Sequence, residues 1–116
     1  MTPWPATASL IGGLTLSALA SAHAVRAQTA GDQSMAGRAF AESACASCHA
    51  VGRTGASPLK AAPPFGEIMA RYPAEDLEEA LAEGIVVGHP AMPNFQLQEP
   101  ELGNLVAYLR TLQPDR

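Results

Sequence analysis

The chain has 116 residues, a formal net charge of −4 at pH 7 and only 5% aromatic residues. This length accommodates one small domain. The negative balance argues against nucleic acid or an anionic membrane surface as a partner. All acidic residues lie at or after Asp32, whereas no charged side chain precedes Arg26. The two ends of the chain are therefore expected to have different roles.

The N-terminal part has the features of an export signal. Ala8 to Ala22 carry no charge, and small residues then recur at the spacing that a signal peptidase recognises, although no Lys or Arg precedes the run. A membrane-spanning helix needs about 20 strongly apolar residues, and this run is shorter and rich in small residues. We expect residues 1–27 to be a signal peptide cleaved after Ala24 or Ala27, with a retained anchor as the alternative. The protein is then periplasmic, with no stable membrane insertion.

Residues 28–116 form the expected functional domain, which is poor in large apolar side chains. Trp4 lies in the export segment and does not contribute to it. A scaffold of this size usually depends on disulfides, a metal or a cofactor for its stability. The acidic residues between Glu75 and Glu83 are typical of the solvated face of a helix.

The first half of this domain is predicted to be one helix, a loop and a short helix. Ser34 is a suitable N-cap for a helix that continues to Ala44, after a polar lead-in at residues 28–33. Residues 52–64 hold two glycines and three prolines, which indicate a loop. A short helix is expected over residues 65–71.

The second half is predicted to be two helices that flank a long loop. Pro73 suits the start of the first helix and Gly84 its end. Pro100 opens the second, whose apolar residues keep helical spacing. These are Leu102, Leu105, Val106, Leu109 and Leu112. Residues 85–98 show no sustained period, and a loop of this length in a small domain is usually functional. No strand pattern is present, so the predicted class is all-α, with three to five short helices and long loops.

Cys45-Ala46-Ser47-Cys48-His49 has the form of a c-type haem attachment site. Residues three and four apart share one face of a helical turn, so Cys45, Cys48 and His49 can all face one flat group. The two thiols add to the vinyl groups of haem and become thioethers, and His49 becomes an iron ligand. We therefore expect one covalently attached haem c.

Other interpretations of the cysteine pair are a thiol–disulfide redox site, half of a zinc site and a structural disulfide. Zinc would need two more ligands, and only His89 and carboxylates remain in the domain. A thioredoxin-like site would require a strand before the motif, and none is predicted. Haem attachment also accounts for the export signal and for the long loop, so it is preferred.

The second axial position of the iron has several candidate ligands. Met92 lies in the unexplained loop between Pro90 and Pro93, which restrict the backbone around it. Its soft sulfur would favour ferrous iron and raise the reduction potential, whereas His89 would lower it. Met69 has the spacing of a core residue. Met92 is the preferred ligand, with His89, Met35 or an open site as the alternatives.

The order of these features resembles class I cytochrome c, the small monohaem periplasmic type. Gly37 and Phe40 resemble the part of the N-terminal helix that crosses the C-terminal helix, here near Tyr108. The resemblance implies that the carbonyl of Pro63 or Pro64 accepts the Nδ1–H of the proximal histidine, His49. It also implies that Met92-Pro93 is the distal ligand loop.

The resemblance implies a cytochrome c-like fold wrapped around one haem, and a monomeric, non-enzymatic electron carrier with transient redox partners. The alternatives are a subunit bound tightly to a periplasmic dehydrogenase or oxidase, a ligand-binding protein with an open iron site, and a thiol–disulfide oxidoreductase. The domain lacks the Trp that many relatives carry. No residue is therefore assigned to hydrogen-bond the inner haem propionate.

Overall fold

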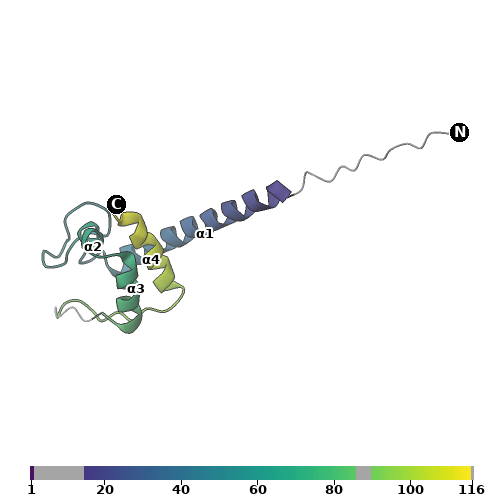
Figure 1. Cartoon of the computed structure of the whole chain (residues 1–116). Helices are drawn as coiled ribbons and strands as arrows, with labels where there is room; N and C mark the ends of the chain where they lie inside the picture. The colour runs from purple at the N-terminus through teal and green to yellow at the C-terminus, as the bar shows by residue number, and fades with distance from the viewer. Residues whose placement is uncertain (2–14, 86–89, 116) are drawn as a thin grey trace.

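The computed structural model describes the backbone of residue 1, residues 15–85 and residues 90–115, with side chains from residue 29 onward within these ranges. The described chain forms four helices and no strand, which confirms the predicted all-α class (Figure 1). The helices are α1 (Thr15–Ala44), α2 (Phe65–Arg71), α3 (Ala74–Glu83) and α4 (Glu101–Leu112). No helix in these ranges combines the length and the apolarity needed to cross a membrane.

The start of α1 differs from the prediction. The helix begins at Thr15, so residues 28–33 are helical and Ser34 is an interior residue rather than an N-cap. The Ser34 hydroxyl donates to the Gly31 carbonyl, 2.9 Å away and three residues earlier in the helix. A serine bonded in this way is compatible with a helix interior. The alanines before it have the highest helix propensity, which continues the helix toward the N-terminus. The first half of α1 projects from the rest of the domain in Figure 1.

Helices α1 and α4 cross at Gly37, as the resemblance to class I cytochrome c implies. A Cβ atom at Gly37 would lie 1.9 Å from the backbone oxygen of Asn104 and 2.9 Å from Cβ of Tyr108. Only a glycine allows the two backbones to approach this closely. Beside the crossing, the Tyr108 hydroxyl donates to the carbonyl of Val51 at 2.8 Å. This bond attaches α4 to the segment that follows the cysteine pair.

The bounds of α2 and α3 agree with the prediction. Pro73 directly precedes α3, and Gly84 ends it with a φ of 103°, a conformation that side chains disfavour. Arg110 of α4 pairs with Glu75 and Glu78 of α3 at 3.0 and 3.6 Å. Exposed pairs of this kind contribute little stability, so the contact between α3 and α4 depends mainly on packing.

Half of the buried hydrophobic side chains of the core come from α4. Six residues of this helix are buried: Leu102, Leu105, Val106, Tyr108, Leu109 and Leu112. Met69 of α2 has no exposed surface, as predicted for a core residue, whereas Met35 of α1 is 66% exposed. The other helices therefore pack against a mainly apolar face of α4.

Candidate functional site

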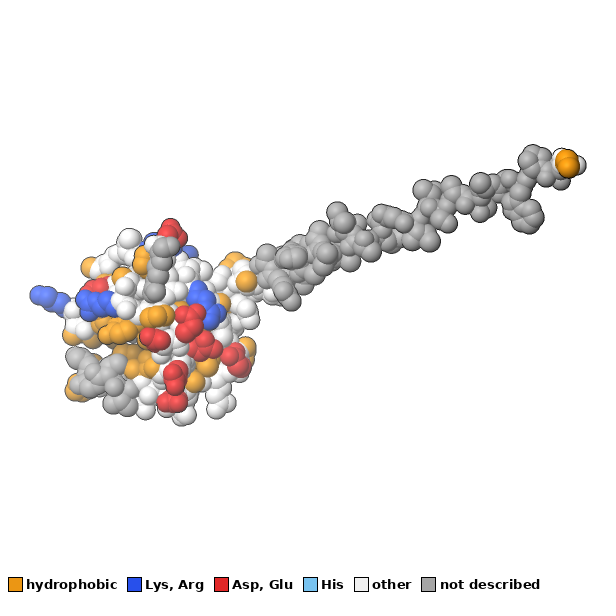
Figure 2. Space-filling model, in the orientation of Figure 1, with side chains coloured by type: hydrophobic (Ala, Val, Ile, Leu, Met, Phe, Trp, Pro, Cys, Tyr) orange, Lys and Arg blue, Asp and Glu red, His pale blue; other side chains and the backbone are white. Residues whose placement is uncertain are grey.

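A cavity of about 800 Å³ lies between the cysteine pair, the loop before α2, helices α2 to α4 and the Met92 loop. Its volume is within the range of sites that bind small molecules or cofactors. Its wall is mainly apolar, and no charged side chain lines it among the described residues. Figure 2 shows hydrophobic side chains reaching the surface over the left half of the domain, whereas most visible acidic side chains lie further right.

Cys45, Cys48 and His49 all line this cavity. Helical hydrogen bonding continues past the end of α1, because the Cys45 amide donates to the Ala41 carbonyl and the His49 amide to the Cys45 carbonyl, each at 2.9 Å. This additional turn places the three side chains on the same wall, as their spacing predicts. No disulfide joins the two thiols.

Burial raises the pKa of the Cys45 thiol, and the negative charge of Cys48 raises it further. The thiolate is the reactive form in thiol–disulfide exchange, and catalytic cysteines have lowered pKa values for that reason. The environment of Cys45 is therefore the opposite of the one that a thiol–disulfide oxidoreductase requires.

The imidazole of His49 has a fixed orientation. Its Nδ1 lies 2.7 Å from the carbonyl oxygen of Pro63. With the Nδ1–H donated to this acceptor, Nε2 is unprotonated and available as a metal ligand. The ring also packs against Phe65, with 5.5 Å between the ring centroids.

The carbonyl that accepts the bond from His49 belongs to Pro63 and not to Pro64. The sequence alone does not distinguish between these two residues. The carbonyl of Pro64 receives the amides of Glu67 and Ile68 at 3.0 and 3.1 Å, at the start of α2. The Phe65 amide donates to the Ala50 carbonyl at 2.8 Å and holds the loop against the cysteine segment. The carbonyl of Pro64 thus accepts hydrogen bonds from α2, whereas the carbonyl of Pro63 faces the imidazole of His49.

Met92 lines the same cavity and is half-buried. Two backbone hydrogen bonds return its loop to the end of α3: the Leu97 amide donates to Leu81 at 2.8 Å, and the Ile85 amide donates to Phe95 at 3.4 Å. Met35 and Met69 do not line the cavity. His89, the alternative ligand, lies outside the described residues.

The residues of the cavity fit haem c. Two thiols, an imidazole whose Nδ1 is held by the Pro63 carbonyl and a thioether line one mainly apolar cavity, which suits a porphyrin. Within the described ranges, no group of three or more His, Cys, Asp and Glu side chains could hold a metal ion directly.

Leu59 and Tyr72 are among the residues of the cavity wall that sequence reasoning missed, and they are also exposed to 36% and 52%. Two signals could have indicated them. Leu59 is a large apolar residue in a loop rich in glycine and proline, and Tyr72 is an aromatic residue at the end of a short helix.

Comparison with known proteins agrees with this geometry. The family model of cytochrome c matches residues 34–113. Cytochrome c-552 of Bradyrhizobium diazoefficiens is 39% identical over 70 residues, which are 60% of this chain and 65% of that protein. The chain thus spans about two thirds of the length of this relative. No solved structure matches this chain significantly. Because the family model covers the cysteine motif, the Met92 loop and the crossing helices together, the chain belongs to the cytochrome c family as a class I member with covalently attached haem c.

Proposed function

We propose that this protein is an exported carrier of single electrons, with His49 and Met92 as the axial ligands of a haem attached through Cys45 and Cys48. The observation that carries the proposal is that one apolar cavity is lined by all four side chains. When bound, the haem supplies a one-electron redox couple.

The residues around the cavity would keep its ligands in place in both oxidation states. The carbonyl of Pro63 fixes the ring of His49, and the backbone bonds at Leu97 and Ile85 fix the Met92 loop. An apolar wall excludes water, and a thioether ligand stabilises ferrous iron, so both raise the reduction potential. Two protein ligands leave no position for a substrate, which favours electron transfer over an enzymatic function.

The decisive experiment for the ligand assignment is Met92→Ala. We expect the variant to lose the absorption band of thioether ligation, to have a lower reduction potential and to bind carbon monoxide when reduced. Met35→Ala is a matched control, because Met35 is 66% exposed and does not line the cavity. A potential and spectrum in Met92→Ala equal to those of the wild type would contradict the assignment and return the choice to His89, Met35 or an open site.

The proposed location rests on the N-terminal sequence. Residues 1–27 have the pattern of a signal peptide, with Ala22 two residues before Ala24 and Val25 two residues before Ala27. The mass of the protein isolated from the periplasm should equal that of residues 25–116 or 28–116 plus one haem. An intact N-terminus on the isolated protein would contradict cleavage.

We further propose that the carrier is a monomer that meets its redox partners transiently. The acidic residues of α3 would steer it toward a basic partner surface. Native size-exclusion chromatography separates this proposal from a tightly bound subunit, because a free carrier elutes at the mass of one chain.

A further inference from the structure

Ala50, the residue directly after His49, has both of its backbone groups bonded across the loop that leads into α2. Its carbonyl accepts the Phe65 amide at 2.8 Å, and its amide donates to the Ser57 hydroxyl at 3.0 Å. The first bond comes from a backbone amide, which any residue except proline supplies. The second comes from a side chain, so it depends on the residue type at position 57.

The backbone of the loop brings Ser57 back to Ala50. Gly55 has a φ of 116°, a conformation that side chains disfavour, and a Cβ built on it would lie 3.9 Å from Cβ of Ala50. The chain therefore turns beside Ala50 two residues before Ser57. Pro58 then restricts Ser57 to extended conformations, which lowers the entropy cost of holding its half-buried hydroxyl in place.

The same loop carries the acceptor of the imidazole proton. Two residues after Ser57, the Leu59 amide donates to the Cys48 carbonyl at 3.1 Å. A few residues further along, the carbonyl oxygen of Pro63 lies 2.7 Å from Nδ1 of His49. The bond made by Ser57 therefore helps to set the distance between the backbone that carries the imidazole and the carbonyl that orients it.

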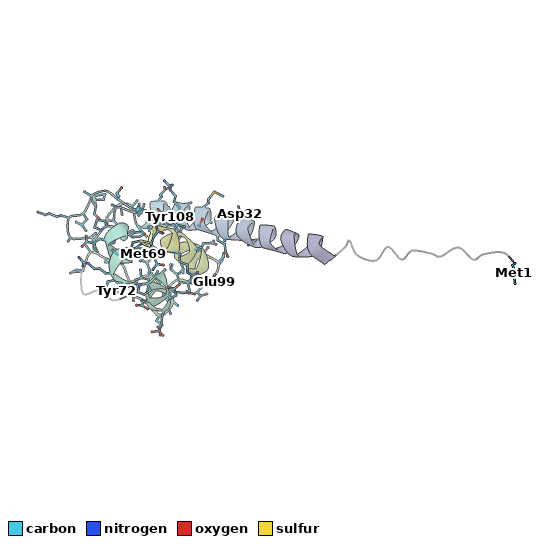
Figure 3. The ribbon with its side chains drawn as sticks, turned by 45° about the horizontal axis from the view of Figure 1, so that its top comes forward. Met1, Asp32, Met69, Tyr72, Glu99 and Tyr108 are labelled. Carbon is cyan, nitrogen blue, oxygen red and sulfur yellow. The ribbon has the colours of Figure 1, made fainter. Side chains whose placement is uncertain are left out.

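Other bonds of the loop lead to α4 instead. The Val51 carbonyl accepts the hydroxyl proton of Tyr108, labelled in Figure 3, at 2.8 Å. The Arg53 guanidinium donates to the Gln113 carbonyl at the end of α4, 3.2 Å away. Among the described side chains of this loop, Ser57 alone bonds to the backbone next to the imidazole.

We infer that Ser57 is a positioning residue for the proposed iron ligand: by holding Ala50, it keeps the Pro63 carbonyl within bonding distance of the Nδ1–H of His49. Ser57 thereby acts on the strength of the bond at Nδ1. A stronger bond there makes the imidazole a more basic ligand, which stabilises ferric iron and lowers the reduction potential. The inference rests on the proposed ligation by His49, and not on the ligation by Met92 or on the export of the protein.

The test compares Ser57→Ala with the wild type, both as the haem-loaded protein. Loss of the bond to Ala50 should weaken the bond between Pro63 and His49, so we expect a more positive reduction potential. We also expect the Nδ1–H of His49 to exchange with solvent up to roughly fivefold faster, which corresponds to a hydrogen bond of about 1 kcal/mol. Proton NMR of the reduced protein measures this exchange.

The sign of the potential shift separates positioning from a loss of stability alone. A loop that only loosens admits water to the cavity, and more polar surroundings stabilise ferric iron and lower the potential. A weakened bond at the imidazole raises the potential instead. Ser57→Thr keeps the hydroxyl and should restore both the potential and the exchange rate. Thr54→Ala removes a hydroxyl from an exposed side chain of the same loop and should change neither.

An unchanged exchange rate in Ser57→Ala, or a potential that stays the same or falls, would overturn the inference. A Ser57→Ala chain that attaches no haem would overturn it too, because positioning acts on the loaded site and not on its formation. The wild-type protein tests the ligation separately. If its reduced spectrum lacks the haem ring-current shifts of an iron-bound imidazole, the proposed ligation by His49 fails, whatever Ser57→Ala does.

Discussion

At the scale of single residues, two adjacent prolines make different hydrogen bonds at the site. Pro64 accepts two amides of the first turn of α2, and Pro63 accepts the Nδ1–H of His49. The sequence alone treats the two carbonyls as equivalent, because it does not show where the first turn of α2 places its amides. The start of a seven-residue helix therefore determines which carbonyl fixes the iron ligand.

Tyr108 is a second residue whose role follows from a single contact. Burial raises the pKa of its hydroxyl, Arg38 opposes this effect, and Glu42 adds to it. The folded protein therefore holds this proton more tightly than the unfolded chain does. The corresponding stability is present below about pH 10, the pKa of an unperturbed tyrosine, and is lost as the pH rises above it.

We predict that Tyr108→Phe lowers the free energy of unfolding by about 1 kcal/mol at pH 7, because the bond to the Val51 carbonyl is lost. The variant should lose less stability than the wild type between pH 9 and pH 11. Denaturant titrations of both proteins across this range measure the difference. Equal slopes of stability against pH would contradict the assignment of the alkaline loss to Tyr108.

At the scale of elements, the crossing of α1 and α4 is the contact that sequence and structure define best. We predict that Gly37→Ala destabilises the protein by about 3 kcal/mol or more, because the new methyl group would overlap the backbone of Asn104. Moving a helix backbone is costlier than rotating a side chain. Denaturant unfolding of the haem-loaded protein measures the effect.

Gly31→Ala is the matched control in the same helix. No atom lies within 4 Å of the position that a Cβ would take at Gly31. This variant should leave the stability unchanged or raise it by less than about 1 kcal/mol, through the better helix propensity of alanine. Equal effects of the two substitutions would show that the close crossing does not limit the packing of α1 against α4.

The sequence predicted those elements whose signals are local. The bounds of α2, the end of α3 at Gly84 and the face of α4 each depend on residues within the element. The predicted start of α1 was wrong because a serine can cap the N-terminus of a helix or donate its hydroxyl to a carbonyl of the preceding turn. Ser34 does the second. Tyr72 was missed because its place in the cavity wall depends on how α2 packs, which the sequence does not encode locally.

At the scale of the whole molecule, the domain is organised around the cavity. Leu105 and Leu109 belong both to the core and to the cavity wall, as do Phe65 and Leu81. The same side chains therefore pack against one another and against the group that the cavity holds. A small domain with so few aromatic residues buries little apolar surface by itself. Covalent haem would provide the area that these side chains need on their open side.

The last prediction follows from this shared wall. In Cys45→Ala combined with Cys48→Ala, we expect no covalent haem and an apoprotein without a cooperative unfolding transition, because the side chains of the wall lose their contact surface. Mass spectrometry of the denatured chain measures the haem, and far-UV circular dichroism under denaturant measures cooperativity. Ser47→Ala is the matched control, since it lies between the two cysteines and should keep both haem and fold. A haem-free double variant that unfolds as cooperatively as Ser47→Ala would contradict the structural role of the haem. Packing among the helices alone would then be sufficient to hold the cavity open.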